Sequence, residues 1–118
     1  LDGGHNPHAA RAIAATLAAL PARATHLICG MLNTKDIAGF MAPLAGLASS
    51  LTALSIPGEA NTLPAEVTAG HARAAGLTAT TADSVHDAIA AITSGSPHAR
   101  ILICGSLYLA GHVLREEA

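Results

Sequence analysis

Short apolar runs alternate with helix-like segments along the sequence, and this alternation limits the possible folds more than any other feature. Two of the runs, THLICGML and RILIC, lack the polar alternation of a half-exposed strand, which is typical of strands covered on both faces. The segments between the runs carry helix signals, such as a proline in the first turn and a glycine just past the end. The pattern therefore predicts an α/β domain with a mainly parallel sheet and helices on both faces.

The spacing of apolar residues and the positions of proline and glycine predict the individual elements. Helices are expected at residues 8–20, 37–47, 64–75, from Asp83 or Ser84 to 92, and at 107–116; strands are expected at 25–32, 51–56, 77–80 and 100–104. Leu1 is all that remains of a strand before the first polar loop. Because a doubly wound sheet should not begin with a one-residue strand, we expect the chain to have been cut from a longer protein at a domain boundary.

Length and composition exclude several classes of protein. The chain has 118 residues and a net charge of −2, which suits one domain without a basic run to follow a phosphate backbone. Phe40 and Tyr108 are its only aromatic residues, so base-stacking platforms are missing and nucleic-acid binding is not expected. No apolar segment approaches the roughly 18–20 residues of a membrane span, and the N-terminus lacks signal-peptide features. We expect a soluble, cytoplasmic protein in which Cys29 and Cys104 are buried core residues.

Three polar loops follow predicted strands and precede predicted helices. They are DGGHN at residues 2–6, NTKD at 33–36 and GS at 105–106. Since the carboxyl ends of parallel strands share one edge of the sheet, where ligands of open α/β sheets bind, we expect these loops to lie together. One acid, one histidine, one lysine and one serine at such an edge suit a small anion, such as an amino-acid carboxylate.

Each loop also has a local explanation that the sequence leaves open. DGG is also an ordinary turn, and His5 could be a capping or solvated group. Lys35 and Asp36 could be a solvated pair in which Asp36 caps the next helix, and Ser106 could be only an N-cap. No phosphate-binding glycine loop is present, so the chain alone should not bind a nucleoside triphosphate tightly. The histidines at 71, 86 and 98 lack metal-ligand spacing and are interpreted as surface residues.

Taken together, the loops resemble a known family. LDGGHNPHAARA, GMLNTKDIAGFMAPL and ILICGSLYLAGHVL, in this order and spacing, are similar to the C-terminal domain of dihydrofolate synthase/folylpolyglutamate synthase, in the Mur ligase superfamily of ATP-dependent amide ligases. GSLYLAG distinguishes the folate enzymes from their cell-wall relatives, and Gly4 departs from the family's usual DGAHNP. The resemblance implies that residues 1–118 are a Rossmann-like three-layer sandwich, the glutamate-ligase C-terminal domain, and that a central ATPase domain lies outside this chain.

The resemblance also implies a function and roles for individual residues. The parent enzyme would use ATP and Mg²⁺, bound mainly by the central domain, to join L-glutamate to a pterin acid or folate through an acyl phosphate. Asp2 would accept hydrogen bonds from the ATP ribose, and His5 would lie near the transferred phosphate as the candidate catalytic residue. Ser106, Lys35 and Asn6 would hold glutamate. The chain alone is expected to be inactive, because half of each site would be missing.

Two other readings of the sequence compete with this one. A stand-alone α/β module that binds a small anion or nucleotide without catalysis would predict a complete strand before Asp2. A domain from a peptidoglycan-type ligase would not be expected to end in GSLYLAG. The choice between dihydropteroate and tetrahydrofolate, the polyglutamate length and the oligomeric state are left open.

Overall fold

A parallel sheet forms the centre of the domain. The computed structural model describes residues 7–21, 24–32, 36–58 and 60–104. Within these residues the strands β1 (Thr25–Cys29), β2 (Ser50–Ala53), β3 (Ala79–Thr81) and β4 (Arg100–Cys104) form one sheet in the order β3-β2-β1-β4, with every neighbouring pair parallel. The predicted α/β class with a parallel sheet is confirmed.

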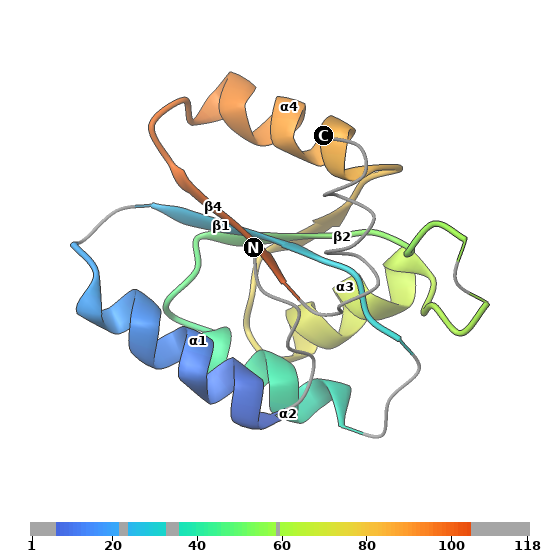
Figure 1. Cartoon of the computed structure of the whole chain (residues 1–118), viewed down its shortest axis with the longest axis horizontal. Coiled ribbons are helices and arrows are strands. Elements are labelled where there is room, and N and C mark those ends of the chain that lie inside the picture. The colour runs from blue at the N-terminus through green and yellow to red at the C-terminus, as the bar shows by residue number, and fades with distance from the viewer. Residues whose placement is uncertain (1–6, 22–23, 33–35, 59, 105–118) are drawn as a thin grey trace.

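Helices cover both faces of this sheet, as predicted (Figure 1). One face carries α1 (Pro7–Ala19), α2 (Ile37–Met41) with the 3₁₀ turn η1 (Ala42–Leu44), and α3 (Ala65–Ala74). The other face carries α4 (Val85–Gly95). The result is a three-layer arrangement of helices, sheet and helix.

The side chains of β1 explain why its last three residues are all apolar. Leu27 and Cys29 belong to the core beneath α1, α2 and α3, while Ile28 between them belongs to the core beneath α4. All three residues are fully buried. Because successive side chains of a strand point to opposite faces, the part of a strand that is covered on both sides presents apolar residues to both faces.

The helix expected at residues 37–47 is shorter than predicted. The α-helical part ends at Met41, and Ala42–Leu44 forms a 3₁₀ turn. Pro43 explains the difference, because it has no N–H to donate to the carbonyl of residue 39 and its ring clashes with that carbonyl in an α-helix. Gly46 then takes a φ of 85°, which turns the chain toward β2.

Other predicted bounds move by a few residues. The strands expected at 25–32, 51–56 and 77–80 are Thr25–Cys29, Ser50–Ala53 and Ala79–Thr81, and the helix expected to end at 92 continues to Gly95. The ladder partners of β1 end at Ala53 and Cys104, so the strand does not continue to residue 32. The backbone N–H groups of Gly76 and Leu77 donate to carbonyls of α3, which delays β3. The helix predicted at 107–116 and Leu1 lie outside the described residues.

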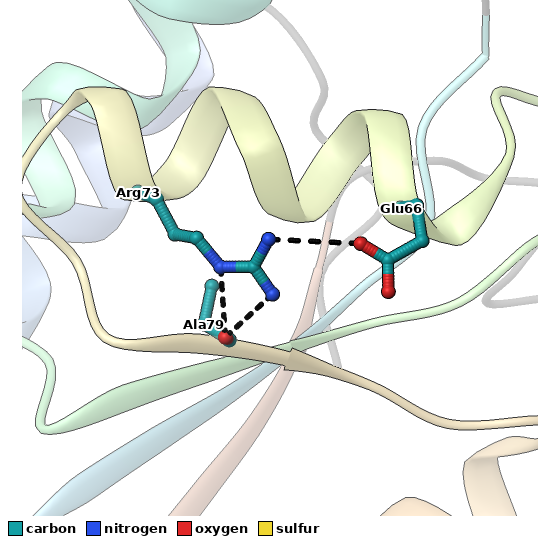
Figure 2. Close-up of polar contacts among 3 residues, drawn as sticks. All are labelled: Glu66, Arg73 and Ala79. Carbon is teal, nitrogen blue, oxygen red and sulfur yellow. Dashed lines mark hydrogen bonds and ion pairs between the residues drawn. The ribbon is translucent and has the colours of Figure 1, made fainter.

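Arg73 fastens α3 to the first residue of β3, as Figure 2 shows. Its Nε and Nη2 donate to the carbonyl oxygen of Ala79 at 3.2 and 3.1 Å. Its Nη1 also lies 3.6 Å from Oε2 of Glu66, but both side chains of this ion pair are largely exposed. A pair of charge-assisted hydrogen bonds to a fixed backbone oxygen should contribute more to the stability of the fold than an ion pair that is screened by water.

We expect Arg73→Ala to lower the free energy of unfolding by about 1–2 kcal/mol, because both bonds to Ala79 are lost. Glu66→Ala serves as the matched control and should change it by less than about 0.5 kcal/mol. Urea unfolding followed by circular dichroism measures both variants. Equal losses of stability in the two variants would mean that the ion pair with Glu66, and not the hydrogen bonds to Ala79, accounts for the contribution of Arg73.

Candidate functional site at the carboxyl edge of the sheet

The carboxyl ends of β1 and β4 lie side by side. These two strands pair in register from Thr25 opposite Arg100 to Cys29 opposite Cys104. We call the border of the sheet formed by Cys29, Ala53, Thr81 and Cys104 the carboxyl edge. The chain leaves β1 toward the polar stretch at 33–36 and leaves β4 toward the polar stretch at 105–106. The strand ends that precede two of the predicted loops are therefore immediate neighbours.

The strand order reverses at this same pair of strands. From β1 the chain progresses through β2 to β3 on one side, with α2 and α3 on one face of the sheet. It then crosses on the opposite face through α4 and places β4 on the other side of β1. In open α/β sheets, ligands bind beyond the carboxyl ends of the strands where the order reverses. The topology thus points to the β1–β4 end of the carboxyl edge.

The start of α1 lies at the same end of the sheet as the carboxyl edge. Figure 1 shows α1 running antiparallel to β1, with its first turn beside α2 and its last turn near the start of β1. Pro7, the first residue of α1, directly follows the polar stretch at residues 2–6. The described residues next to all three predicted loops therefore belong to one region of the molecule.

The predicted site residues themselves are not described. Asp2, His5, Asn6, Lys35 and Ser106 all lie outside the residues that the structure describes. The structure places the elements that flank them, and the individual roles of these five residues stay predictions.

Asp36 is occupied in starting α2. The backbone N–H of Gly39 donates to its Oδ1 at 2.9 Å, so the carboxylate acts as the N-cap of the helix. This confirms the local interpretation of Asp36. A Cβ atom at position 39 would lie 2.6 Å from Cγ of Asp36, which is too close for two carbon atoms. The observed conformation of the cap therefore leaves no room for a side chain at position 39, and the cap marks where α2 begins.

Two thiols meet at the carboxyl edge. Cys29 and Cys104 are free cysteines and are 0% and 1% exposed, which confirms their prediction as buried core residues. The neighbouring Cys104 thiol, together with burial, raises the pKa of the Cys29 thiol well above its ordinary value. The sequence contains no signal for this contact, because the pairing depends on the register of two strands far apart in the chain.

A side-chain hydrogen bond and a cavity lie near the opposite, amino ends of the strands. Nδ1 of His26 and Oγ of Ser50 form a 2.5 Å hydrogen bond between residues paired near the starts of β1 and β2. A cavity of about 180 Å³ lies between α1 and β4, with Arg100 in its wall. The Arg100 guanidinium donates to Oγ1 of Thr25 at 3.4 Å and to the carbonyl of Pro21 at 3.1 Å. These contacts hold the amino ends of the strands and serve structure.

Metal binding and membrane insertion find no support in the described ranges. No group of three or more histidine, cysteine, aspartate or glutamate side chains there could hold a metal ion. No helix there is long and apolar enough to cross a membrane. Of the histidines predicted at the surface, His86 and His98 are exposed and His71 is partly buried.

Comparison with known proteins shows the family. Residues 1–107 match the family described as Mur ligase, glutamate ligase domain. The chain belongs to the Mur ligase family. The comparison with curated proteins gave no match.

Solved structures of folate ligases share the fold of this Mur ligase domain. Mycobacterium tuberculosis folylpolyglutamate synthase, solved with ADP and AMPPCP, is 31% identical with a TM-score of 0.86 over 98% of this chain. E. coli FolC, solved with DHPP and ADP, is 30% identical with a TM-score of 0.84 over 99%. A bifunctional folylpolyglutamate synthase/dihydrofolate synthase with Mn, AMPPNP and L-glutamate bound is 29% identical with a TM-score of 0.83 over 99%. The chain spans 28% of the length of each of these proteins.

Gly39→Ala should displace the Asp36 cap, which contributes about 1 kcal/mol, and this loss offsets the gain in helix propensity. Gly70 in α3 is the matched control, because a Cβ there meets nothing within 4 Å. Gly70→Ala should therefore raise the free energy of unfolding by about 0.5–1 kcal/mol.

A double-mutant cycle by urea unfolding isolates the clash between residue 39 and the cap. In the Asp36→Ala background no carboxylate is left to displace, so Gly39→Ala should stabilise the protein much as Gly70→Ala does. If Gly39→Ala behaves the same with and without Asp36, the glycine is not needed for the cap.

Proposed function

We propose that this domain supplies the glutamate-binding part of an ATP-dependent ligase that adds L-glutamate to dihydropteroate, to reduced folates, or to both. The observation that carries this proposal is the likeness of nearly the whole chain, at TM-scores of 0.83–0.86, to folate ligases. One of these was solved with L-glutamate and a nucleotide analogue together. The Mur ligase family alone supports the coarser part of the proposal, an ATP-dependent ligase.

The proposed reaction has two chemical steps. ATP first transfers its terminal phosphoryl group to a carboxylate of the pteroate or folate, which gives an acyl phosphate and ADP. The amino group of L-glutamate then attacks the acyl carbon, and phosphate leaves from a tetrahedral intermediate as the amide forms. The acyl phosphate reacts readily with water, so closure of this domain against a central ATPase domain would protect it and complete the site.

The carboxyl edge offers a suitable place for the glutamate carboxylate. We propose that Lys35 supplies a positive charge to it, while Ser106 donates the hydrogen bond that fixes its orientation. Support comes from the pairing of Cys29 with Cys104, since Lys35 and Ser106 lie shortly after the ends of these strands. Neighbouring strands are about 4.8 Å apart, so the segments that follow β1 and β4 start close together.

The stretch before α1 would serve the nucleotide and the reacting groups. We propose that the carboxylate of Asp2 accepts hydrogen bonds from the ribose hydroxyls, which suits a group that is only an acceptor when ionised. We place His5 near the transferred phosphate and Asn6 near the incoming glutamate. All three would be carried by the start of α1, whose first described residue is Pro7.

Magnesium is assigned to the rest of the parent enzyme. When bound, Mg²⁺ would offset the negative charge of the nucleotide phosphates. The described residues hold no acidic cluster that fits such an ion. We propose that the central ATPase domain binds most of the metal–nucleotide complex.

Ser106→Ala in the parent enzyme should raise the KM for L-glutamate about 10-fold or more, because a hydrogen bond to a charged group contributes about 1.5–3 kcal/mol. The KM for ATP should change much less. Steady-state kinetics with each substrate varied in turn measures both constants. Equal effects on both would remove Ser106 from the glutamate site.

Phosphate release tests the proposed function directly. The parent enzyme is given ATP and L-glutamate with dihydropteroate or with tetrahydrofolate, and each substrate is omitted in turn. Release that requires both glutamate and a pterin acid would establish a folate ligase, and the preferred acid would identify the reaction. Release with cell-wall precursors only would assign the domain to another branch of the Mur ligase family.

The isolated chain provides a second measurement. Residues 1–118 alone should release no phosphate from ATP under the same conditions, because the proposed ATPase domain is missing. Turnover by the isolated chain would contradict the division of labour between the two domains.

A further inference from the structure

The contact between Cys29 and Cys104 has the features of a disulfide precursor. The two residues are register partners on neighbouring parallel strands, and both side chains belong to the core beneath α1, α2 and α3, so they point to the same face. Neighbouring strands are about 4.8 Å apart, within the range of about 4.4–6.8 Å that separates the Cα atoms of disulfides. The Cys104 thiol is also near enough to raise the pKa of the Cys29 thiol.

We propose that Cys29 and Cys104 form a redox pair, a dithiol that closes reversibly to a disulfide across the carboxyl ends of β1 and β4. The oxidant is a low-molecular-weight disulfide. One cysteine thiolate attacks a sulfur of the oxidant, which forms a mixed disulfide and releases one small thiol. The second cysteine, after losing its proton, attacks the protein sulfur of that mixed disulfide and releases the second small thiol. The protein loses two hydrogens and the oxidant is reduced to two thiols.

Burial sets the rate of this reaction. Both side chains are almost completely covered, and the raised pKa of Cys29 keeps the attacking thiolate scarce at neutral pH. The reaction therefore needs a local opening of the carboxyl edge. We expect the pair to stay reduced during brief exposure to the oxidant and to form the disulfide during prolonged exposure. Burial thus slows the oxidation of the two thiols, while their register positions allow a disulfide to form once the oxidant reaches them.

Closure would stiffen the carboxyl edge beside the site. A disulfide fixes its two Cβ atoms about 3.8 Å apart, so the bond would hold the ends of β1 and β4 at one spacing and limit their local opening. The stretches that contain Lys35 and Ser106 begin just beyond these ends. This effect on glutamate binding rests on the proposed function, whereas the formation of the bond does not.

Thiol–disulfide equilibration tests the redox pair without any assay of activity. The folded chain is equilibrated with mixtures of 2-mercaptoethanol and its disulfide, and the reaction is quenched with acid. Mass spectrometry then measures the mass of the intact chain. We expect a species that is lighter by two hydrogens and carries no adduct, which dithiothreitol reverses. Peptide mapping of the oxidised wild-type chain should show the peptide of Cys29 linked by a disulfide to the peptide of Cys104.

The same equilibration in urea gives the reference. We expect the effective concentration of the two thiols for each other to be at least about tenfold higher in the folded chain than in the unfolded chain. An equal or lower value in the folded chain would overturn the proposal, as would a folded chain that accumulates two small-thiol adducts and no crosslink. Circular dichroism confirms that the fold persists during the titration.

Single variants complete the test. Cys29→Ser and Cys104→Ser should each stop at one mixed disulfide or remain reduced, since neither has a second thiol to resolve the adduct. Loss of two hydrogens in either variant would show that the mass change has another source. In the parent enzyme, the crosslinked form should show a glutamate KM raised several-fold and restored by dithiothreitol, and an unchanged KM would overturn the coupling to the site.

Discussion

The position of β1 between β2 and β4 is the constraint on which the rest of the structure depends. Leu27, Ile28 and Cys29 are each fully buried, and their side chains divide between the two cores on opposite faces of the sheet. Burying an aliphatic side chain contributes about 1.5–3 kcal/mol, so this short strand stabilises both layers of helices at once. The same strand sets the register of its two neighbours, and hence the place where the carboxyl ends of the sheet meet.

That arrangement connects packing with function. The chain lays down β1, β2 and β3 in one direction and then returns across the opposite face to place β4 beside β1. Two stretches far apart in the sequence, after Cys29 and after Cys104, thereby start from adjacent strand ends. The proposed glutamate site depends on this adjacency, because Lys35 and Ser106 would have to reach one small carboxylate from the loops that follow these strand ends. The core supplies it, because both strands are held by apolar contacts and by the parallel ladder.

The sequence predicted what depends on local signals and missed what depends on contacts between distant segments. Ser84 caps α4 and Gly76 takes a φ of 101° after α3, both at positions that the residue types indicate. Pro43 shortened a predicted helix for a local reason, because proline has no N–H to donate and its ring clashes in an α-helix. The strand order and the register of Cys29 with Cys104 have no local signal, because they follow from how whole faces pack. Of the predicted site, Asp36 proved to be a cap, and the other residues rest on family resemblance.

The side-chain sizes beneath α1, α2 and α3 explain why thiols stand at the carboxyl edge. One row across the central strands is large and aliphatic, formed by Leu51, Leu27 and Leu102; the next row toward the edge is small, formed by Ala53, Cys29 and Cys104. The large row fills the core, while the small row leaves room for the buried side chains of α2 in the same cluster. Cysteine suits this row because it is small and apolar enough for the core. Two cysteines side by side in such a row bring their sulfur atoms together without a bulky neighbour between them, so the packing of the edge itself creates the redox pair.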